Sequence, residues 1–278
     1  MEDLTKEAWE TFRQVQEKRP LVQCITNFVT VNDCANMILA AGGSPSMAHD
    51  IREAAEAVTA AQALVCNLGA IGDTDAMEAA GKAANFHGIP VVFDPVAAGG
   101  TSLRRAESAR LMRAVHFSVI RGNASEIRFL AGEQSFGSGV DAGAFDEITE
   151  ENLSAASMMA KELAEKTDSV IAASGQLDLI SDSRRTAVLR NGSPVMARIT
   201  GSGCMLTALI GAFCGVCQED CFTAVFAAAA VMGVCGELAD MKRLEKGTGN
   251  ASFRNDLIDA VFNLTEKQFK ERINYEIF

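Results

Sequence analysis

The stretch that decides the fold is residues 63–94, ALVCNLGAIGDTDAMEAAGKAANFHGIPVVFD. It begins with the apolar run Ala63–Asn67 and ends with a second apolar run, Val91–Asp94. Residues 73–87 between them have the pattern of a helix, and Gly88-Ile89-Pro90 marks the turn that follows it. Two buried strands joined by a helix form a right-handed βαβ unit, so we expect a parallel sheet covered by helices.

The alternation of strand and helix continues on both sides of this unit. Further helices are expected at residues 4–18, 32–41, 51–61, 103–114, 124–131 and 150–166. Further strands are expected at residues 20–26, 118–121 and 169–173, and a short extended piece at residues 44–47. Two extended pieces, residues 176–181 and 186–189, predict a β-hairpin, so the last part of the sheet should be antiparallel. The sequence therefore predicts an α/β fold with a mostly parallel central sheet flanked by helices on both faces.

The remaining segments are consistent with a single domain, residues 1–278. Residues 205–215 and the alanine-rich sequence after Cys221 predict apolar helices that are buried or lie at an interface. Residues 133–149 are rich in glycine and polar side chains, so we expect a surface excursion there rather than a linker between domains.

The composition is that of a globular protein. Of the 278 residues, 48% are hydrophobic and 22% are charged, and the formal net charge is −11. A strongly acidic chain lacks the basic face that nucleic acids and anionic membranes need, so we expect neither as a partner. No run of about 18 apolar residues without a charge occurs, so no segment is expected to span a membrane.

The cysteines indicate the redox compartment. Eight are present, mostly within apolar runs, and residues 1–20 are charged and amphipathic without the hydrophobic core of a secretory signal. We therefore expect free thiols and a cytoplasmic location. Cys214, Cys217 and Cys221 are spaced like part of a zinc site, but no second Cys or His pair lies at a usual distance, so we expect no zinc.

A glycine-punctuated turn precedes an apolar helix in ITGSGCMLTAL, residues 199–209. Gly201 and Gly203 let the backbone approach an anion closely, and the start of a helix presents unpaired N–H groups and the positive end of its dipole. The same dipole is expected to lower the pKa of the Cys204 thiol. The alternative is a glycine-rich helix cap with a half-buried structural cysteine.

Polar side chains stand at or just beyond the ends of several expected strands. They are Asn27, Asp94, Arg121, Glu126 and Ser174. Ligands of open α/β sheets bind beyond the carboxyl ends of the strands, so these side chains should share one edge. Asp94 and Glu126 could hold a hydrated Mg²⁺ ion, and Arg121 could bind a phosphate, which together suggest phosphoryl transfer. Individually, Asp94 could be a turn residue, and Asn123 with Glu126 could form a helix cap.

The absence of common nucleotide-binding motifs excludes several classes of enzyme. The sequence contains no Walker-type GxxxxGK[ST] motif, no kinase-type glycine-rich loop with its lysine, and no GxGxxG after an early strand. A P-loop enzyme, a protein kinase and a nicotinamide-dependent dehydrogenase are therefore not expected.

Six short segments then point to a family. They are PLVQCITN (20–27), GSPSMAH (43–49), VFDPV (92–96), RGNASE (121–126), GVD (139–141) and TGSGC (200–204). In this order and spacing they resemble the hydroxyethylthiazole kinase family, whose fold is ribokinase-like. The resemblance implies ATP- and Mg²⁺-dependent phosphorylation of the hydroxyl of 4-methyl-5-(2-hydroxyethyl)thiazole, in thiamin biosynthesis and salvage. It also implies a homotrimer with the active site at the subunit interface.

The resemblance further implies roles for single residues around the substrate. Cys204 would be the catalytic residue, at a position where most ribokinase-like kinases have an aspartate base. Met47 would line the thiazole pocket, Gly201 would contact the substrate near its hydroxyl, and Asn27 would lie in the same region.

For the nucleotide, the resemblance implies that Arg121 and Ser174 bind the phosphates of ATP. Asp94 and Glu126 would serve the magnesium ion. Ser174 stands where threonine is common, and either hydroxyl can donate a hydrogen bond to phosphate.

Two alternatives stay open from the sequence. One is another ribokinase-like enzyme, such as a kinase for a different small heterocyclic alcohol or a nucleotide-hydrate dehydratase, which would usually carry aspartate at position 204. The other is a non-catalytic regulator that binds the thiazole or a nucleotide, which would be expected to lose Asp94, Glu126 or Arg121.

Overall fold

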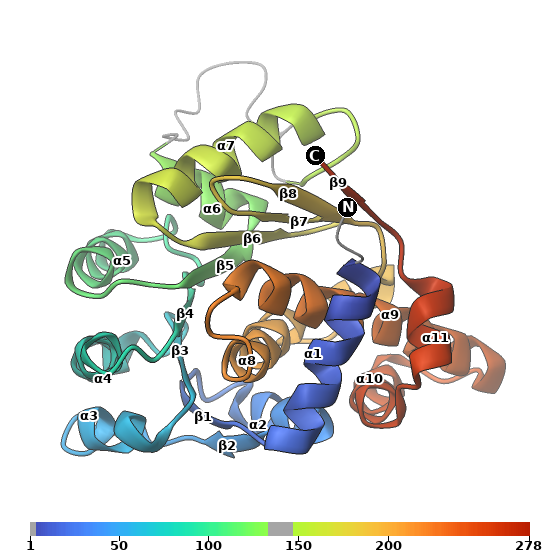
Figure 1. The fold of residues 1–278 in the computed structure, drawn as a ribbon, viewed down its shortest axis with the longest axis horizontal. Coiled ribbons are helices and arrows are strands. Elements are labelled where there is room, and N and C mark those ends of the chain that lie inside the picture. The colour runs from blue at the N-terminus through green and yellow to red at the C-terminus, as the bar shows by residue number, and fades with distance from the viewer. Residues whose placement is uncertain (1–3, 133–146) are drawn as a thin grey trace.

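The computed structural model describes residues 4–132 and 147–278. Within these residues, nine strands form one sheet in the order β2-β1-β3-β4-β5-β6-β7-β8-β9 (Figure 1). Most of the expected surface excursion, residues 133–146, lies outside the described residues, and so does the segment 139–141.

The first six strands run parallel and the last three are antiparallel, as the sequence predicts. The parallel strands are β1 (Leu21–Ile25), β2 (Ser44–Ser46), β3 (Ala63–Asn67), β4 (Val91–Asp94), β5 (Val119–Asn123) and β6 (Val170–Ser174). The antiparallel strands are β7 (Asp178–Ser181), β8 (Thr186–Leu189) and β9 (Tyr275–Ile277). Only β9 is not anticipated from the sequence, since it is a three-residue strand that exists through its pairing with β8.

Helices cover both faces of the sheet (Figure 1). One face carries α1 (Leu4–Lys18), α2 (Val31–Ala40), α8 (Ser202–Cys214), α9 (Cys221–Lys246), α10 (Asn250–Asn263) and α11 (Glu266–Arg272). The other carries α3 (Ala54–Ala57), α4 (Thr74–Phe86), α5 (Ser102–Ala114), α6 (Ala124–Ala131) and α7 (Leu153–Thr167). In β3, Val65 faces the first layer while Leu64 and Cys66 face the second, because successive side chains alternate across a strand.

One predicted helix, residues 51–61, is shorter than expected. The structure has only α3 and a single 3₁₀ turn, Val58–Ala60. Val58 and Thr59 are β-branched and restrict the helix at that point, and the Thr59 hydroxyl donates to the Glu56 carbonyl oxygen at 2.7 Å.

α9 is the central helix of its layer. By length and hydropathy alone it could cross a membrane, but 83% of its most apolar stretch is buried inside the protein. It packs against α1, α8 and α10 and against β6, β7 and β8, so its apolar surface belongs to the core. The charge-free part of this helix ends at Glu237, so the helix does not contradict the sequence expectation about charge-free apolar runs.

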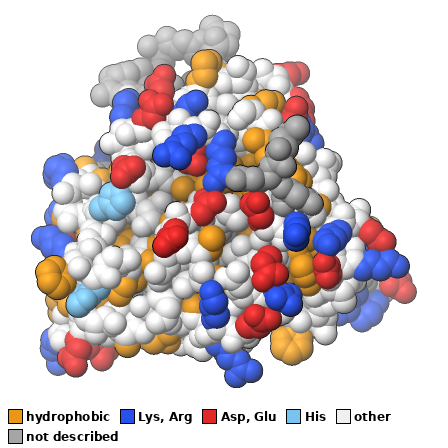
Figure 2. All heavy atoms as spheres, in the orientation of Figure 1, with side chains coloured by type: hydrophobic (Ala, Val, Ile, Leu, Met, Phe, Trp, Pro, Cys, Tyr) orange, Lys and Arg blue, Asp and Glu red, His pale blue; other side chains and the backbone are white. Residues whose placement is uncertain are grey.

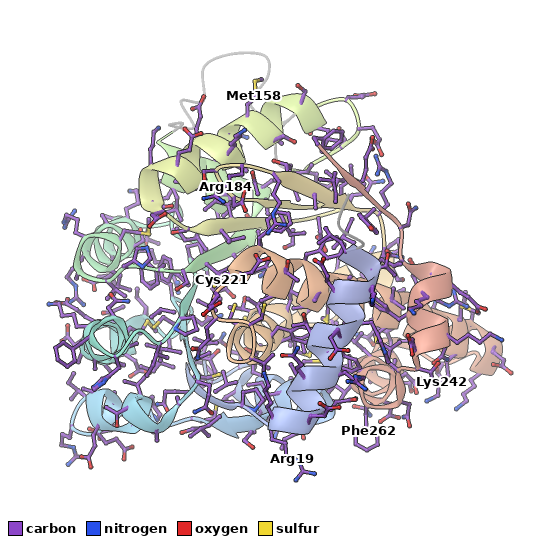
Figure 3. The ribbon with its side chains drawn as sticks, in the orientation of Figure 1. Arg19, Met158, Arg184, Cys221, Lys242 and Phe262 are labelled. Atoms are coloured by element: carbon purple, nitrogen blue, oxygen red, sulfur yellow. The ribbon has the colours of Figure 1, made fainter. Side chains whose placement is uncertain are left out.

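The surface is polar and carries charges of both signs. Figure 2 shows Lys and Arg side chains interspersed with Asp and Glu on the face viewed. Exposed apolar side chains on that surface include Met158 on α7 and Phe262 on α10, which point away from the core (Figure 3).

The pairing of β1 prepares a ligand site. β1 pairs with β2 on one side and with β3 on the other, so the direction in which the sheet grows reverses there. The connections that leave neighbouring strands at such a point run to opposite faces of the sheet and leave a crevice for ligands beyond the carboxyl ends of the strands. Along the same edge, the register places Asn67 beside Asp94 and Asn123 beside Ser174.

Candidate active site

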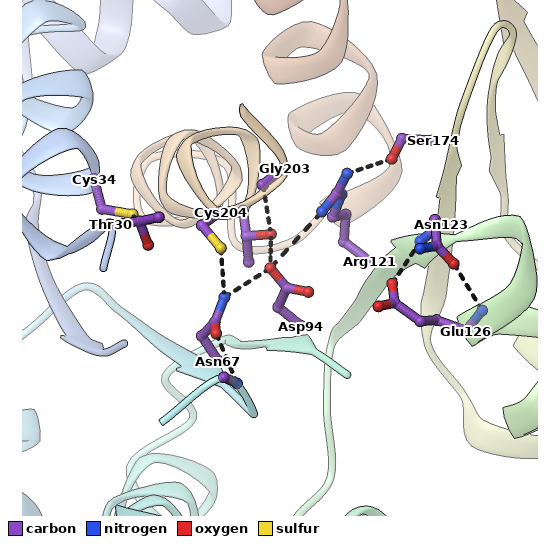
Figure 4. Close-up of polar contacts among 12 residues, drawn as sticks. Thr30, Cys34, Asn67, Asp94, Arg121, Asn123, Glu126, Ser174, Gly203 and Cys204 are labelled. Carbon is purple, nitrogen blue, oxygen red and sulfur yellow. Dashed lines mark hydrogen bonds and ion pairs between the residues drawn. The ribbon is translucent and has the colours of Figure 1, made fainter. Parts of the chain in front are cut away.

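The polar residues expected at the sheet edge do converge there. Asn67, Asp94, Asn123 and Ser174 are the last residues of β3, β4, β5 and β6, and Asn27 follows β1. The first turn of α8 lies across this edge and brings Cys204 to the same place (Figure 4). The side chains expected to share this edge, Asn27, Asp94, Arg121, Glu126 and Ser174, are brought together there, and Cys204 joins them.

Cys204 lies in a cradle of amide groups. Its Sγ accepts hydrogen bonds from Asn67 Nδ2 at 3.2 Å and from Asn27 Nδ2 at 3.4 Å. Asn27 is itself held by Thr30, whose backbone N–H and hydroxyl both donate to Asn27 Oδ1 at 3.1 Å. The thiol therefore has a fixed position beyond the carboxyl ends of β1 and β3.

The expectation of a lowered pKa at Cys204 is wrong. Burial raises the pKa of the Cys204 thiol, and the nearby carboxylate of Asp94 raises it further. Hydrogen bonds from Thr30, Asn67 and Asn27 act in the opposite direction but do not outweigh burial. At neutral pH the sulfur is therefore mainly a thiol.

Asp94 is a buried carboxylate in which one oxygen accepts hydrogen bonds and the other accepts none from the described residues. Its Oδ2 accepts hydrogen bonds from Asn67 Nδ2 and Thr207 Oγ1, each at 2.8 Å, and lies 3.8 Å from Arg121 Nη1. Its Oδ1 is buried without a hydrogen-bond partner among the described residues. Burial raises the pKa of Asp94 to about 6, and the charge of Glu126 also raises it, against the lowering effects of Arg121, Thr207 and Asn67.

Arg121 stands directly over the start of α8. A side-chain carbon at Gly203 would lie 2.5 Å from Arg121 Nη1, so only glycine leaves room for the guanidinium there. Arg121 Nη2 donates to Ser174 Oγ, and the side chain is buried. A buried guanidinium beside the N–H groups of a helix start is a strong anion site.

Glu126 performs the structural role that the sequence left open. Asn123 and Glu126 form a capping box at the start of α6, with Glu126 N to Asn123 Oδ1 at 2.9 Å and Asn123 N to Glu126 Oε2 at 2.8 Å. Glu126 Oε1 also accepts from Ala97 N at 2.7 Å, which ties α6 to the loop after β4. Its charge nevertheless reaches Asp94, so the two carboxylates form one acidic region.

The remaining predicted substrate residues lie at the same edge of the sheet. Met47 follows β2 and packs, half-buried, against the core of the layer that contains α8. Gly201 precedes α8 with a φ of +82°, and a side-chain carbon there would collide with Thr30 Cγ2. Gly201 is therefore required for the close approach of this turn to α2.

The sequence analysis missed two polar residues of the site. Asn67 joins Cys204 to Asp94, and Thr207, one turn into α8, donates to Asp94. Asn67 could have been found, because it ends a buried strand just as Asp94 does. The contact of Thr207 depends on how α8 packs on the sheet, which no sequence pattern indicates.

The carboxylates of Asp94 and Glu126 are the candidate metal ligands of this site. Among the described residues, no group of three or more His, Cys, Asp or Glu side chains could hold a metal ion by itself. A magnesium ion needs few protein ligands because it keeps several waters and binds nucleotide phosphates. The unpartnered Oδ1 of Asp94, with Glu126 nearby, fits that requirement.

The comparisons with known proteins agree with this geometry. The model of the hydroxyethylthiazole kinase family matches residues 12–267. The chain belongs to the hydroxyethylthiazole kinase family. Hydroxyethylthiazole kinase from Clostridium acetobutylicum is 42% identical over 271 residues, which cover 97% of this chain and 99% of that protein. The family resemblance inferred from the six segments is therefore confirmed.

Other members of the family show the same agreement. Hydroxyethylthiazole kinase from Clostridium beijerinckii is 46% identical over 256 residues, covering 91% of this chain and 90% of that protein. The solved structure of a hydroxyethylthiazole kinase protein from Pyrococcus horikoshii OT3 has a TM-score of 0.85 and 33% identity, covering 98% and 99% of the two chains. The predicted ribokinase-like α/β fold is confirmed.

Proposed function

We propose that this protein transfers the γ-phosphoryl group of ATP to the hydroxyl of 4-methyl-5-(2-hydroxyethyl)thiazole, with Mg²⁺, as a step of thiamin biosynthesis or salvage. The observation that carries the proposal is the meeting of the Cys204 thiol, the Asp94 carboxylate and the Arg121 guanidinium at the start of α8. Family membership over nearly the whole chain supports the choice of substrate.

In this proposal, Arg121 and the first N–H groups of α8 bind the charge on the transferred phosphoryl group. Such preorganised donors stabilise a transition state without rearrangement, and phosphoryl transfer depends mostly on positioning and charge stabilisation. Ser174 accepts a hydrogen bond from Arg121 and so orients the guanidinium toward the phosphates. Ser174 itself would also bind the nucleotide.

Asp94 and Glu126 would hold the magnesium ion, which when bound neutralises charge on the nucleotide phosphates. Asp94 has a buried oxygen available for this, whereas both oxygens of Glu126 already accept backbone N–H groups. We therefore assign Asp94 the larger share of the metal binding.

Cys204 would accept the proton of the attacking hydroxyl. Only the thiolate form can do this, and it is the minor form at neutral pH because burial raises the pKa of the thiol. That thiolate is strongly basic, so it can take the proton late, when the hydroxyl has already begun to bond to phosphorus. Met47 and Gly201 would line the thiazole pocket. Asn27 acts mainly on the sulfur, because its amide hydrogens point to Cys204 and Asn67.

We also propose a cytoplasmic homotrimer with the active site at the subunit interface. Phe28 and Val29 directly follow Asn27 and are 90% and 57% exposed, which supports contact with a second subunit beside this edge of the sheet. Light scattering after gel filtration should give three times the chain mass. A monomer that turns over at the full rate would contradict the interface site.

The test of the proposed function is a coupled assay of ADP release with Mg-ATP and the thiazole alcohol. ADP release that depends on the thiazole supports the proposal. No release, together with thermal stabilisation by Mg-ATP, would keep the nucleotide site and move the search to other heterocyclic alcohols. The absence of both would contradict a kinase and favour a non-catalytic binding protein.

A further inference from the structure

The side chain of Asn67 uses every hydrogen-bonding position it has. Its two amide hydrogens point to Asp94 Oδ2 at 2.8 Å and to Cys204 Sγ at 3.2 Å. Its Oδ1 accepts from Gly69 N at 2.9 Å and from Asn27 Nδ2 at 3.2 Å. The residue is 1% exposed, so water does not compete for these positions. Because an amide has two donors and two acceptor sites, its orientation here is fully determined.

The hydrogen bonds of Asn67 go beyond those needed to end strand β3. A residue that only ended β3 would need to satisfy its own amide and the turn at Gly69. Asn67 instead sends both donors across the sheet edge, one to β4 and one to α8 (Figure 4). Its orientation is set by Gly69 N, which is part of the backbone and cannot rotate away.

We propose that Asn67 is a positioning residue that holds the Cys204 sulfur at a fixed distance from Asp94, so that the sulfur faces the substrate hydroxyl. This inference rests on the proposed function of the same site. Asn67 touches no substrate atom in this account, and it acts only through Cys204 and Asp94. Asp94 has further support from Thr207 and Arg121, whereas among the described residues the hydrogen-bond partners of the sulfur are the two amides and Thr30, so the thiol depends more on Asn67.

The decisive test is a double-mutant cycle between Asn67→Ala and Cys204→Ala, measured as kcat with saturating Mg-ATP and thiazole. If Asn67 acts through the sulfur, Asn67→Ala lowers kcat about tenfold or more in the wild type, as loss of a supporting hydrogen bond does at other sites. In the Cys204→Ala background the same change lowers kcat less than about threefold, because the group it positions is gone. Equal losses in both backgrounds would overturn the proposal.

A second measurement does not need kinase activity. The rate at which iodoacetamide alkylates Cys204 at pH 8, followed by peptide mass spectrometry, reports the thiolate fraction. Asn67→Ala removes a donor that favours the thiolate, so alkylation should slow, although the smaller side chain gives the reagent more room. Faster or unchanged alkylation would contradict the proposed contact. If the wild type fails to phosphorylate the thiazole but alkylation slows, the proposed function fails while the contact stands.

Two further variants guard against a trivial loss of folding. Asn85→Ala removes an asparagine of α4 that bridges to the backbone of His116 at 2.8 Å, far from the sheet edge that holds Cys204. It should lower thermal stability, because two hydrogen bonds to the backbone are lost, but leave kcat and Cys204 alkylation unchanged. If Asn67→Ala does not fold, Asn67→Ser, which keeps a hydroxyl donor, replaces it in both measurements. The single, shorter donor of serine cannot bond both Cys204 and Asp94, so wild-type kcat together with wild-type alkylation in Asn67→Ser would overturn the proposal.

Discussion

Gly203→Ala is the sharpest perturbation of the anion site. The added methyl group would lie 2.5 Å from Nη1, 3.0 Å from Nη2 and 3.1 Å from Cζ of Arg121. Real contacts of this kind are never so close, so the guanidinium must move. It donates to Ser174 and lies 3.8 Å from Asp94, and to clear the methyl group it must shift away from the start of α8.

The expected loss follows from the contact that is displaced. A hydrogen bond between charged groups contributes about 1.5–3 kcal/mol, so kcat/KM for Mg-ATP should fall by about 10- to 150-fold. The loss should be small in an Arg121→Ala background, because the displaced group is absent there. The measurement is the coupled ADP assay at several ATP concentrations.

Gly72→Ala is the matched control, because a side-chain carbon at Gly72 meets nothing within 4 Å. It should retain wild-type kcat/KM. A folded Gly203→Ala protein with wild-type kcat/KM for Mg-ATP would refute the placement of Arg121 as a phosphate-binding group at the start of α8.

Other perturbations test the rest of the site. Cys204→Asp should keep or raise turnover and Cys204→Ala should lower it, in the ADP assay; an inactive Asp variant beside a fully active Ala variant would contradict a base. Since burial raises the pKa of Asp94 to about 6, above its value in the unfolded chain, its contribution to stability is complete below about pH 4 and is lost as the pH rises through 6. In metal-free buffer, Asp94→Asn should therefore remove roughly 1–3 kcal/mol of the decline in stability between pH 4 and 7, measured by urea unfolding, and an unchanged decline would refute that assignment. Mg-ATP and the thiazole should each raise the melting temperature when added alone. Each should add about 2.7 kcal/mol to the free energy of unfolding at a ligand concentration a hundred times its dissociation constant, and EDTA should reduce the effect of ATP.

The parallel core of the fold could be predicted because its signals are local. Ala63–Asn67 and Val91–Asp94 are continuous apolar runs, which is what a strand buried on both faces requires. Strand β9 could not be predicted in the same way, since Tyr275–Ile277 becomes a strand only by meeting β8. The end of α3 depends on β-branched residues whose effect competes with the apolar periodicity.

The sequence could predict which side chains meet at the sheet edge, but not the hydrogen bonds that connect them. Asp94, Arg121 and Ser174 end or lie near the ends of recognisable strands, so a common edge followed from the topology. The role of Asn67 required the register of β3 against β4 and the placement of α8. The direction of the pKa shift at Cys204 required its burial, which the position of a cysteine at a helix start does not reveal.

The central claim is that the hydroxyl oxygen of the thiazole alcohol becomes bonded to phosphorus. Thiazole alcohol labelled with ¹⁸O in its hydroxyl group, incubated with Mg-ATP and the protein, tests it by mass spectrometry of the products. The account predicts a phosphorylated thiazole that retains the label, with unlabelled ADP formed in equal amount. Unlabelled inorganic phosphate and unchanged labelled thiazole would contradict it, because the protein would then transfer the phosphoryl group to water.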